Sequence, residues 1–415
     1  MRYSTLLRLI RLIITAMTLL LFLVGCGGNT SASLAEAPPS TQSAVFPTST
    51  PKLPTPEPTL TPVPKTPKPT PVAPTSQPSN KGKLVKGQIT SQALADNLIG
   101  DPATRHFYVY LPADYDTRDK HYPVIYVLHG FWGNESDYIG MGPELDKLTA
   151  GGEVGEMILV FLNADNKFGG SQYLSSPTIG DYERYITEEL VSYIDANYRT
   201  LPQRDSRGIT GCSMGGDGSL HLALTYPEVF SVAAPMSGMY DAEHDPMWEI
   251  ERLKFGREPE NFDDVYGEWF ISFAAGAASN PDKPPFYLDM PFKLVDGKGQ
   301  IVPKVRQKII AADVIHDVPD YLNQPVRLRG LLIYHGEYDG FAPVEVIRDF
   351  DKMLTELGVA HEYVEVKANH CNMDRSVVFK FMADHLIFDQ ADDISKVEQY
   401  SWTDLEMNEK SKNSN

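Results

Sequence analysis

The stretch Gly211-Cys212-Ser213-Met214-Gly215 has the pattern G-x-S-x-G, in which flanking glycines leave room for a strained serine between a strand and a helix. Its surroundings fit that context. Residues 208–211 form a short run typical of a strand, and residues 218–224 continue at helical spacing, with an end expected before Pro227. The stretch therefore predicts a nucleophile elbow with Ser213 as the nucleophile, although the bare pattern also occurs in ordinary glycine-rich turns.

Segments typical of strands and of helices alternate through the region 84–388. Several expected strands are almost entirely apolar, as buried parallel strands are. This alternation predicts an α/β fold with an open, mostly parallel central sheet and helices on both faces. The expected strands are 107–111, 123–128, 157–162, 209–210, 229–234, 330–334 and 362–366, and the expected helices are 181–197, 213–225, 344–357 and 376–386.

Residues 240–325 interrupt the alternation with an aromatic-rich run and the stretch Pro284-Pro285-Phe286-Tyr287. We interpret this segment as an insertion. Because sites in open α/β sheets lie beyond the carboxyl ends of the strands, we expect it to form a cap over the catalytic edge. A surface excursion away from the site is the alternative interpretation.

A serine nucleophile needs a base within hydrogen-bond reach and a third group to orient that base. Two loops supply these partners in the chain order serine, acid, histidine. The loop after the expected strand 330–334 holds two carboxylates, Glu337 and Asp339, and the loop after 362–366 holds His370. His370 is the predicted general base, and position alone leaves both carboxylates open as the acid.

Residues 128–133 follow an apolar strand with the sequence Leu-His-Gly-Phe-Trp-Gly. The turn would leave the backbone N–H of Phe131 pointing at the same place as the N–H of Met214. Two such donors can stabilise a developing oxyanion, and the Met214 N–H adds the field of a helix N-terminus. Phe131 and Met214 are therefore the predicted oxyanion-hole residues, unless residues 129–130 merely end a strand.

With these motifs together, most of the region 107–388 resembles the esterase D and enterochelin esterase-like group of α/β-hydrolases, which includes feruloyl and acetyl esterases and mycolyltransferases. The resemblance implies the α/β-hydrolase fold and a serine esterase or acyltransferase with Ser213, Asp339 and His370 as the triad. It also implies the Phe131 and Met214 amides as oxyanion donors and no metal or organic cofactor. The matching stretches are 128–130, 169–173, 176–177, 181–186, 198–200, 211–216 and, in the insertion, 280–287.

The residues beside His370 depart from the family pattern. Ala368-Asn369 precede the histidine and Cys371-Asn372 follow it, where the family often has glycines before and an aromatic residue after. This departure concerns substrate contacts near His370 and leaves its role in proton transfer unchanged.

Residues 1–26 carry three arginines ahead of an apolar run that is too short for a membrane span, as in a secretion signal. The end of this segment, Leu23-Val24-Gly25-Cys26, resembles a bacterial lipobox, so Cys26 is the predicted lipidation site. An ordinary signal peptide with an incidental cysteine is the alternative.

Residues 27–83 are rich in Pro, Thr and Ser, and this composition predicts an extended spacer. A proline-rich ligand for another domain is the alternative interpretation. Residues 389–415 read as an acidic, solvated tail without an assigned function.

The chain has 37 Lys and Arg against 55 Asp and Glu, a formal charge of -18, which argues against nucleic-acid binding. Its histidines lack the paired spacing of metal ligands, so no metal site is predicted.

If Cys26 is lipidated, Cys212 and Cys371 are the two cysteines that remain in the chain. Triad geometry must bring their backbones near each other, but we expect their side chains to diverge, because a disulfide tolerates only narrow Cα and Cβ separations. A disulfide formed in an oxidising compartment is the alternative.

These observations favour a serine carboxylesterase held by a lipid anchor on the outer face of the bacterial cytoplasmic membrane. Its expected substrate is an ester of a small molecule or of a cell-wall or plant polysaccharide, cleaved through an acyl-enzyme. If an alcohol resolved the acyl-enzyme instead of water, the same residues would make an acyltransferase. A noncatalytic binding lipoprotein that retained the fold is the hypothesis from another class. The sequence leaves the oligomeric state open.

Overall fold

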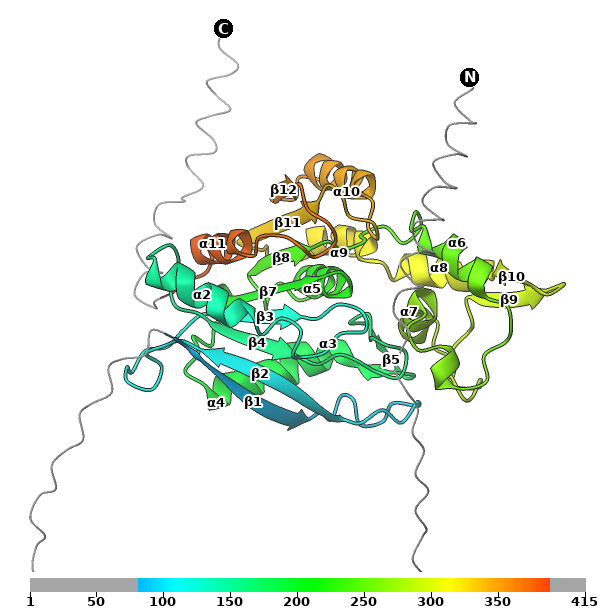
Figure 1. Ribbon diagram of the computed structural model, residues 1–415, viewed down its shortest axis with the longest axis horizontal. Helices are drawn as coiled ribbons and strands as arrows, with labels where there is room; N and C mark the ends of the chain where they lie inside the picture. The colour runs from blue at the N-terminus through cyan, green and yellow to red at the C-terminus, as the bar shows by residue number, and fades with distance from the viewer. Residues whose placement is uncertain (1–80, 389–415) are drawn as a thin grey trace, which may run out of the picture. The chain divides into compact units, whose positions relative to one another are not determined.

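The computed structural model describes residues 81–388 (Figure 1). The predicted leader, nearly all of the predicted spacer, and the acidic tail lie outside these residues, as does Cys26. Among residues 81–388, no helix is both long and apolar enough to cross a bilayer. The folded region begins slightly earlier than predicted, because Lys83 already pairs in the first strand.

An eight-stranded sheet with the order β1-β2-β4-β3-β7-β8-β11-β12 forms the centre of the fold. The β1–β2 and β2–β4 pairs are antiparallel, and every other neighbouring pair is parallel. The predicted α/β fold with a mostly parallel sheet is therefore confirmed. Its strands are β1 (Lys83–Thr90), β2 (Thr104–Leu111), β3 (Val124–Leu128), β4 (Ile158–Leu162), β7 (Arg207–Cys212), β8 (Val232–Met236), β11 (Gly330–Gly336) and β12 (Glu362–Val366).

Helices cover both faces of the sheet. Alternate side chains of the buried strands point to opposite faces, so each face carries apolar side chains that a layer of helices buries. In β3, Tyr126 belongs to the buried cluster that also contains residues of α3, α5 and α10, whereas Ile125 belongs to the cluster with residues of α2 and α11 on the other face. These helices are α2 (Met141–Ala150), α3 (Tyr182–Arg184), α5 (Met214–Thr225), α10 (Val344–Glu356) and α11 (Ser376–His385). The helix α3 continues through a π-helical stretch, η1 (Tyr185–Leu190), into α4 (Val191–Asn197), so the predicted helix 181–197 is one uninterrupted segment. The 3-10 turn η2 (Arg204–Ser206) and the short β5 (Ser175–Ser176) and β6 (Gly180–Asp181) pair complete the core.

The insertion lies between β8 and β11, and Figure 1 shows most of it grouped beyond one end of the sheet. Three side-chain hydrogen bonds hold its helix α7 against residues 170–176, and in one of them Gln172 Nε2 donates to Ser272 Oγ at 3.0 Å. Ser272 Oγ donates to Gly170 O at 2.9 Å, and Ser176 Oγ donates to Ala275 O at 2.6 Å. The inserted elements are α6 (Met247–Lys254), η3 (Phe262–Asp264), α7 (Trp269–Ala277), β9 (Phe292–Val295), β10 (Lys298–Ile301), α8 (Pro303–Ala311), η4 (Val314–His316) and α9 (Asp317–Asn323).

His221 joins the insertion to the core. The residue is on α5, and its Nδ1 lies 2.7 Å from Asp317 Oδ2 on α9, while its Nε2 lies 3.7 Å from Glu183 Oε1 on α3. Burial favours a lower pKa for His221, but the two carboxylates outweigh burial and raise the pKa to about 10. The imidazolium therefore bridges two carboxylates from separate parts of the chain.

We predict that His221→Gln lowers the free energy of unfolding by about 1 to 3 kcal/mol at pH 6, less than a fully buried pair would lose because the carboxylates are partly exposed. Since the folded-state pKa of His221 exceeds the unfolded value of about 6.5, this contribution is complete below pH 6.5 and is lost as the pH rises through about 10. Urea unfolding of wild type and variant at pH 6 and pH 9 measures it. The difference between the two proteins should shrink by more than half at pH 9, and an equal difference at both pH values would refute the bridge.

Candidate active site

Ser213 occupies a sharp turn between β7 and α5, with φ 61° and ψ -127°. This is a sparsely populated backbone conformation for a residue with a side chain. The turn packs tightly, since a Cβ at Gly211 would clash with the Gly215 carbonyl and a Cβ at Gly215 would clash with the Leu128 carbonyl. The glycines of the predicted elbow are therefore required by close backbone contacts.

His370 and Asp339 form a hydrogen-bonded pair. Asp339 accepts from His370 Nδ1, which lies 2.8 Å from its Oδ2 and 2.9 Å from its Oδ1. The same carboxylate accepts from the backbone N–H of Phe341 at 2.9 Å and of Ala342 at 3.0 Å. Burial favours a higher pKa for Asp339, but His370 and these two N–H groups outweigh it and lower the pKa. The carboxyl is thus kept ionised beside the imidazole. In the described part of the chain, no hydrogen bond joins Glu337 to His370.

Ser213 and His370 line one cavity of about 370 Å³. Among the described residues, 81–388, no hydrogen bond joins the side chains of Ser213 and His370 directly. Such bonds are often long in enzymes without substrate and tighten when substrate binds. The cavity is large enough for the acyl or alcohol part of a small ester.

The turn that follows β3 lies directly beside Ser213. A Cβ on Gly130 would come within 3.5 Å of Ser213 Cβ, and Gly133 N–H closes the turn by donating to Gly130 O at 3.0 Å. In the described residues, neither the N–H of Phe131 nor that of Met214 donates to a backbone carbonyl outside the regular helices and strands. Neither N–H is therefore engaged by a backbone carbonyl there, as the prediction for oxyanion donors requires.

His129 fixes this turn, a role that the sequence analysis did not assign. Its Nε2 accepts from the backbone N–H of Ala164 at 2.8 Å, so its Nδ1 carries the proton and donates to Gly130 O at 2.8 Å. Burial lowers the pKa of His129, which keeps the imidazole neutral and preserves this pattern. The position of His129 directly before Gly130 was the only signal in the sequence.

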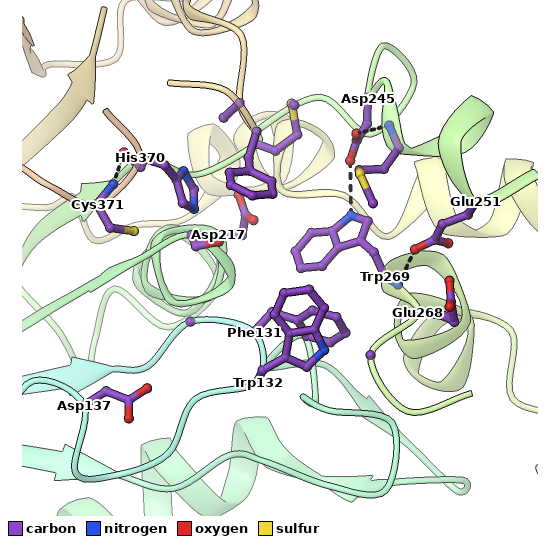
Figure 2. A pocket seen from close by; sticks show the side chains of 18 of the residues that line it. Phe131, Trp132, Asp137, Asp217, Asp245, Glu251, Glu268, Trp269, His370 and Cys371 are labelled. Atoms are coloured by element: carbon purple, nitrogen blue, oxygen red, sulfur yellow. Dashed lines mark hydrogen bonds between the residues drawn. The ribbon is translucent and has the colours of Figure 1, made fainter. Parts of the chain in front are cut away.

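Aromatic side chains form the walls of the cavity (Figure 2). The rings of Phe131 and Trp269 meet edge to face at 5.2 Å, Trp132 packs against Phe131 at 5.1 Å, and Phe341 packs against His370 at 4.9 Å. Trp269 belongs to α7, so the insertion supplies one wall of the cavity. Sequence patterns did not single out Trp269 or Phe341, because their role depends on how distant segments meet.

Carboxyl groups from the core and the insertion also line the cavity. The indole N–H of Trp269 donates to Asp245 Oδ2 at 3.1 Å, and Glu251 accepts from the backbone N–H of Trp269. Burial raises the pKa of Asp245 to about 6 and of Glu251 to about 8, and it raises the pKa of Asp217 well above its usual value. Apart from His370, the only basic side chain in the cavity lining is Lys254. Because these raised pKa values favour the protonated form, Glu251 and Asp217 contribute polar but largely uncharged groups to the cavity at neutral pH.

The expectation that the side chains of Cys212 and Cys371 diverge is wrong. The two residues form a disulfide, with their Cα atoms 5.8 Å apart. Cys371 has φ 56°, in the left-handed region that non-glycine residues seldom adopt, and this conformation turns its side chain toward Cys212. A local backbone conformation of this kind cannot be deduced from the residue types alone.

The region of the site resembles known esterases in sequence. Residues 102–272 match the model of a family described as "Putative esterase". An "Endo-1,4-beta-xylanase/feruloyl esterase" of Xylanibacter ruminicola is 32% identical over 140 residues, which cover 31% of this chain and 19% of that protein. An esterase of Mycobacterium tuberculosis is 32% identical over 204 residues, covering 42% of this chain and 43% of that protein. The chain thus spans less than half the length of these curated relatives.

A solved structure of a ferulic acid esterase has the same fold. It matches with a TM-score of 0.52 at 20% identity, over 74% of this chain and 99% of the matched chain. Together with the mostly parallel sheet and the helices on both faces, this similarity identifies the fold as that of an α/β-hydrolase.

Proposed function

Residues 102–272 belong to the esterase family whose model they match, and from this premise we propose that the protein is a serine carboxylesterase. In the proposal, Ser213 is the nucleophile, His370 the general base and Asp339 the group that orients it. The observation that carries the proposal is that His370, hydrogen-bonded to the buried Asp339 at 2.8 Å, lines the same cavity as the strained Ser213.

The proposed reaction proceeds through an acyl-enzyme. Ser213 Oγ attacks the ester carbonyl while His370 Nε2 accepts its proton, and the N–H groups of Phe131 and Met214 donate to the oxyanion. Collapse of the tetrahedral intermediate releases the alcohol, which takes the proton from His370. Water then attacks the acyl-enzyme with His370 again as the base, so that ester and water become acid and alcohol. Asp339 holds the imidazole tautomer and stabilises the imidazolium throughout.

The cavity suits an ester with an apolar, uncharged group beside Ser213. Its walls are the rings of Phe131, Trp132, Trp269 and Phe341, and Lys254 is the one basic side chain of the lining besides His370. The feruloyl esterase among the relatives by sequence supports an aromatic acyl group. We therefore propose uncharged esters of small molecules or of polysaccharides as the substrate class.

The proposal includes anchoring at the cell surface. Cys26 would carry the lipid, and residues 27–83, rich in proline, would hold the catalytic region away from the membrane. The lipobox-like stretch 23–26 supports this part of the proposal.

The choice between the two carboxylates gives a direct test. We predict that Asp339→Asn lowers kcat by about 10³ to 10⁴, as in serine proteases, because the amide keeps the shape but not the charge that supports His370. Glu337→Gln is the matched control from the same loop and should cost less than about tenfold. Both are measured with one activated ester. A large loss of kcat in Glu337→Gln together with a near-normal kcat in Asp339→Asn would show that Glu337, and not Asp339, is the acid.

Lipidation gives a second test. Wild-type protein expressed in a bacterium with its full leader should fractionate with membranes, because acyl chains on Cys26 partition into the bilayer and the polar spacer cannot. Cys26→Ser should impair processing. Mass spectrometry of the mature N-terminal peptide decides the matter, since a wild-type peptide without lipid excludes the anchor.

A further inference from the structure

The candidate catalytic groups belong to two structural units. The elbow with Ser213 follows β7, and the turn with Phe131 follows its neighbour β3. Asp339 and His370 follow β11 and β12, and β12 is the last strand of the sheet. In the sheet order, β8 and β11 separate β7 from β12. The proposed mechanism requires these two units to keep a fixed distance while a proton moves between them.

The histidine loop, residues 367–372, is tied mainly to the acid unit. Tyr338 N–H donates to Ala368 O at 3.0 Å, and His370 bonds to Asp339. Among the described residues, no hydrogen bond joins this loop directly to the elbow, and Cys371 N–H donates to Ser237 Oγ in the loop after β8 at 3.4 Å. Bonds of this length contribute little. Apart from this bond, hydrogen bonding connects the histidine loop to the elbow only indirectly, through the pairing of β7, β8, β11 and β12.

The Cys212–Cys371 disulfide connects the histidine loop directly to the elbow. Cys212 is the last residue of β7 and directly precedes Ser213, while Cys371 directly follows His370. The covalent bond thus joins the immediate neighbours of the proposed nucleophile and base across 159 residues of sequence. The left-handed conformation of Cys371 is of the kind that persists only where the surrounding structure imposes it.

Resting on the function proposed above, we infer that this disulfide is a positioning element of the active site. It holds His370 at the distance from Ser213 that proton transfer requires, so the oxidised protein turns over and the reduced protein loses most of its turnover. A misplacement of about 1 Å at a catalytic group can cost on the order of 10²-fold in rate. The inference also explains why two cysteines lie in an apolar cavity wall and at a strand end.

A small dithiol such as dithiothreitol can break the bond from the cavity. Cys212 is 1% exposed, whereas Cys371 is half-buried and lines the cavity. A thiolate of the dithiol attacks Cys371 Sγ, and Cys212 leaves as a thiolate that takes up a proton. The second thiol then displaces Cys371 Sγ, so that two electrons and two protons pass to the protein and the reagent becomes a cyclic disulfide.

The test compares oxidised wild type, wild type reduced with dithiothreitol and then desalted, Cys212→Ala, Cys371→Ala and the double variant on one activated ester. The reduced wild type and all three variants should lose about 10- to 100-fold in kcat, with KM changed less than about threefold. The singles and the double should agree, because the second substitution has no bond left to remove. Reoxidation with glutathione disulfide should restore only the wild type, and dithiothreitol should leave the double variant unchanged. Asn372→Ala, an exposed neighbour that keeps the bond, should stay within about twofold.

A purely stabilising disulfide would behave differently. It would lower the Tm of the variants and leave kcat per folded molecule, measured well below that Tm, at the wild-type value, and this result would overturn the inference. Unfolding of both the variants and the reduced wild type in the assay buffer would also overturn it, because the bond would then serve the fold alone. The proposed function fails separately, if the oxidised wild type neither hydrolyses esters nor reacts with a fluorophosphonate.

Discussion

The contact between the Gly215 backbone and the Leu128 carbonyl is the constraint on which the site depends. Because β3 and β7 are paired neighbours, this contact holds the start of α5 against the end of β3. Ser213 is thereby held in its unusual conformation beside the turn at Gly130. A larger residue at position 215 would separate the two strand ends, and with them the proposed nucleophile and the proposed oxyanion donors. The proposed chemistry at Ser213 therefore requires the close packing of the adjacent strands β3 and β7.

The other half of the site depends on electrostatics and on the insertion. Asp339 is ionised although buried, because His370 and two backbone N–H groups interact with its oxygens. The insertion contributes Trp269 to the cavity wall, and hydrogen bonds to the core keep α7 in place. The insertion therefore places an aromatic wall opposite the proposed catalytic groups, which suits an apolar part of a substrate.

The parallel core could be predicted from the sequence because its buried strands are continuous apolar runs, such as Ile158–Leu162. The antiparallel strand Lys83–Thr90 and the helix Met141–Ala150 could not be, because the strand is largely exposed at the sheet edge and the helix contains glycine and proline near its start. The Ser213 elbow and the loop order were readable from local motifs. The Cys212–Cys371 bond and the Trp269 wall were not, because the bond depends on a left-handed backbone conformation and the wall on long-range packing of the insertion.

The central claim is that Ser213 is the nucleophile of an ester hydrolase. The most direct measurement is kcat of purified Ser213→Ala against wild type on one activated ester, with circular dichroism to establish that both proteins are folded. The account predicts a fall of several orders of magnitude, comparable with the loss of about 10⁶ on removal of the subtilisin nucleophile. An unchanged kcat in the folded variant would contradict it.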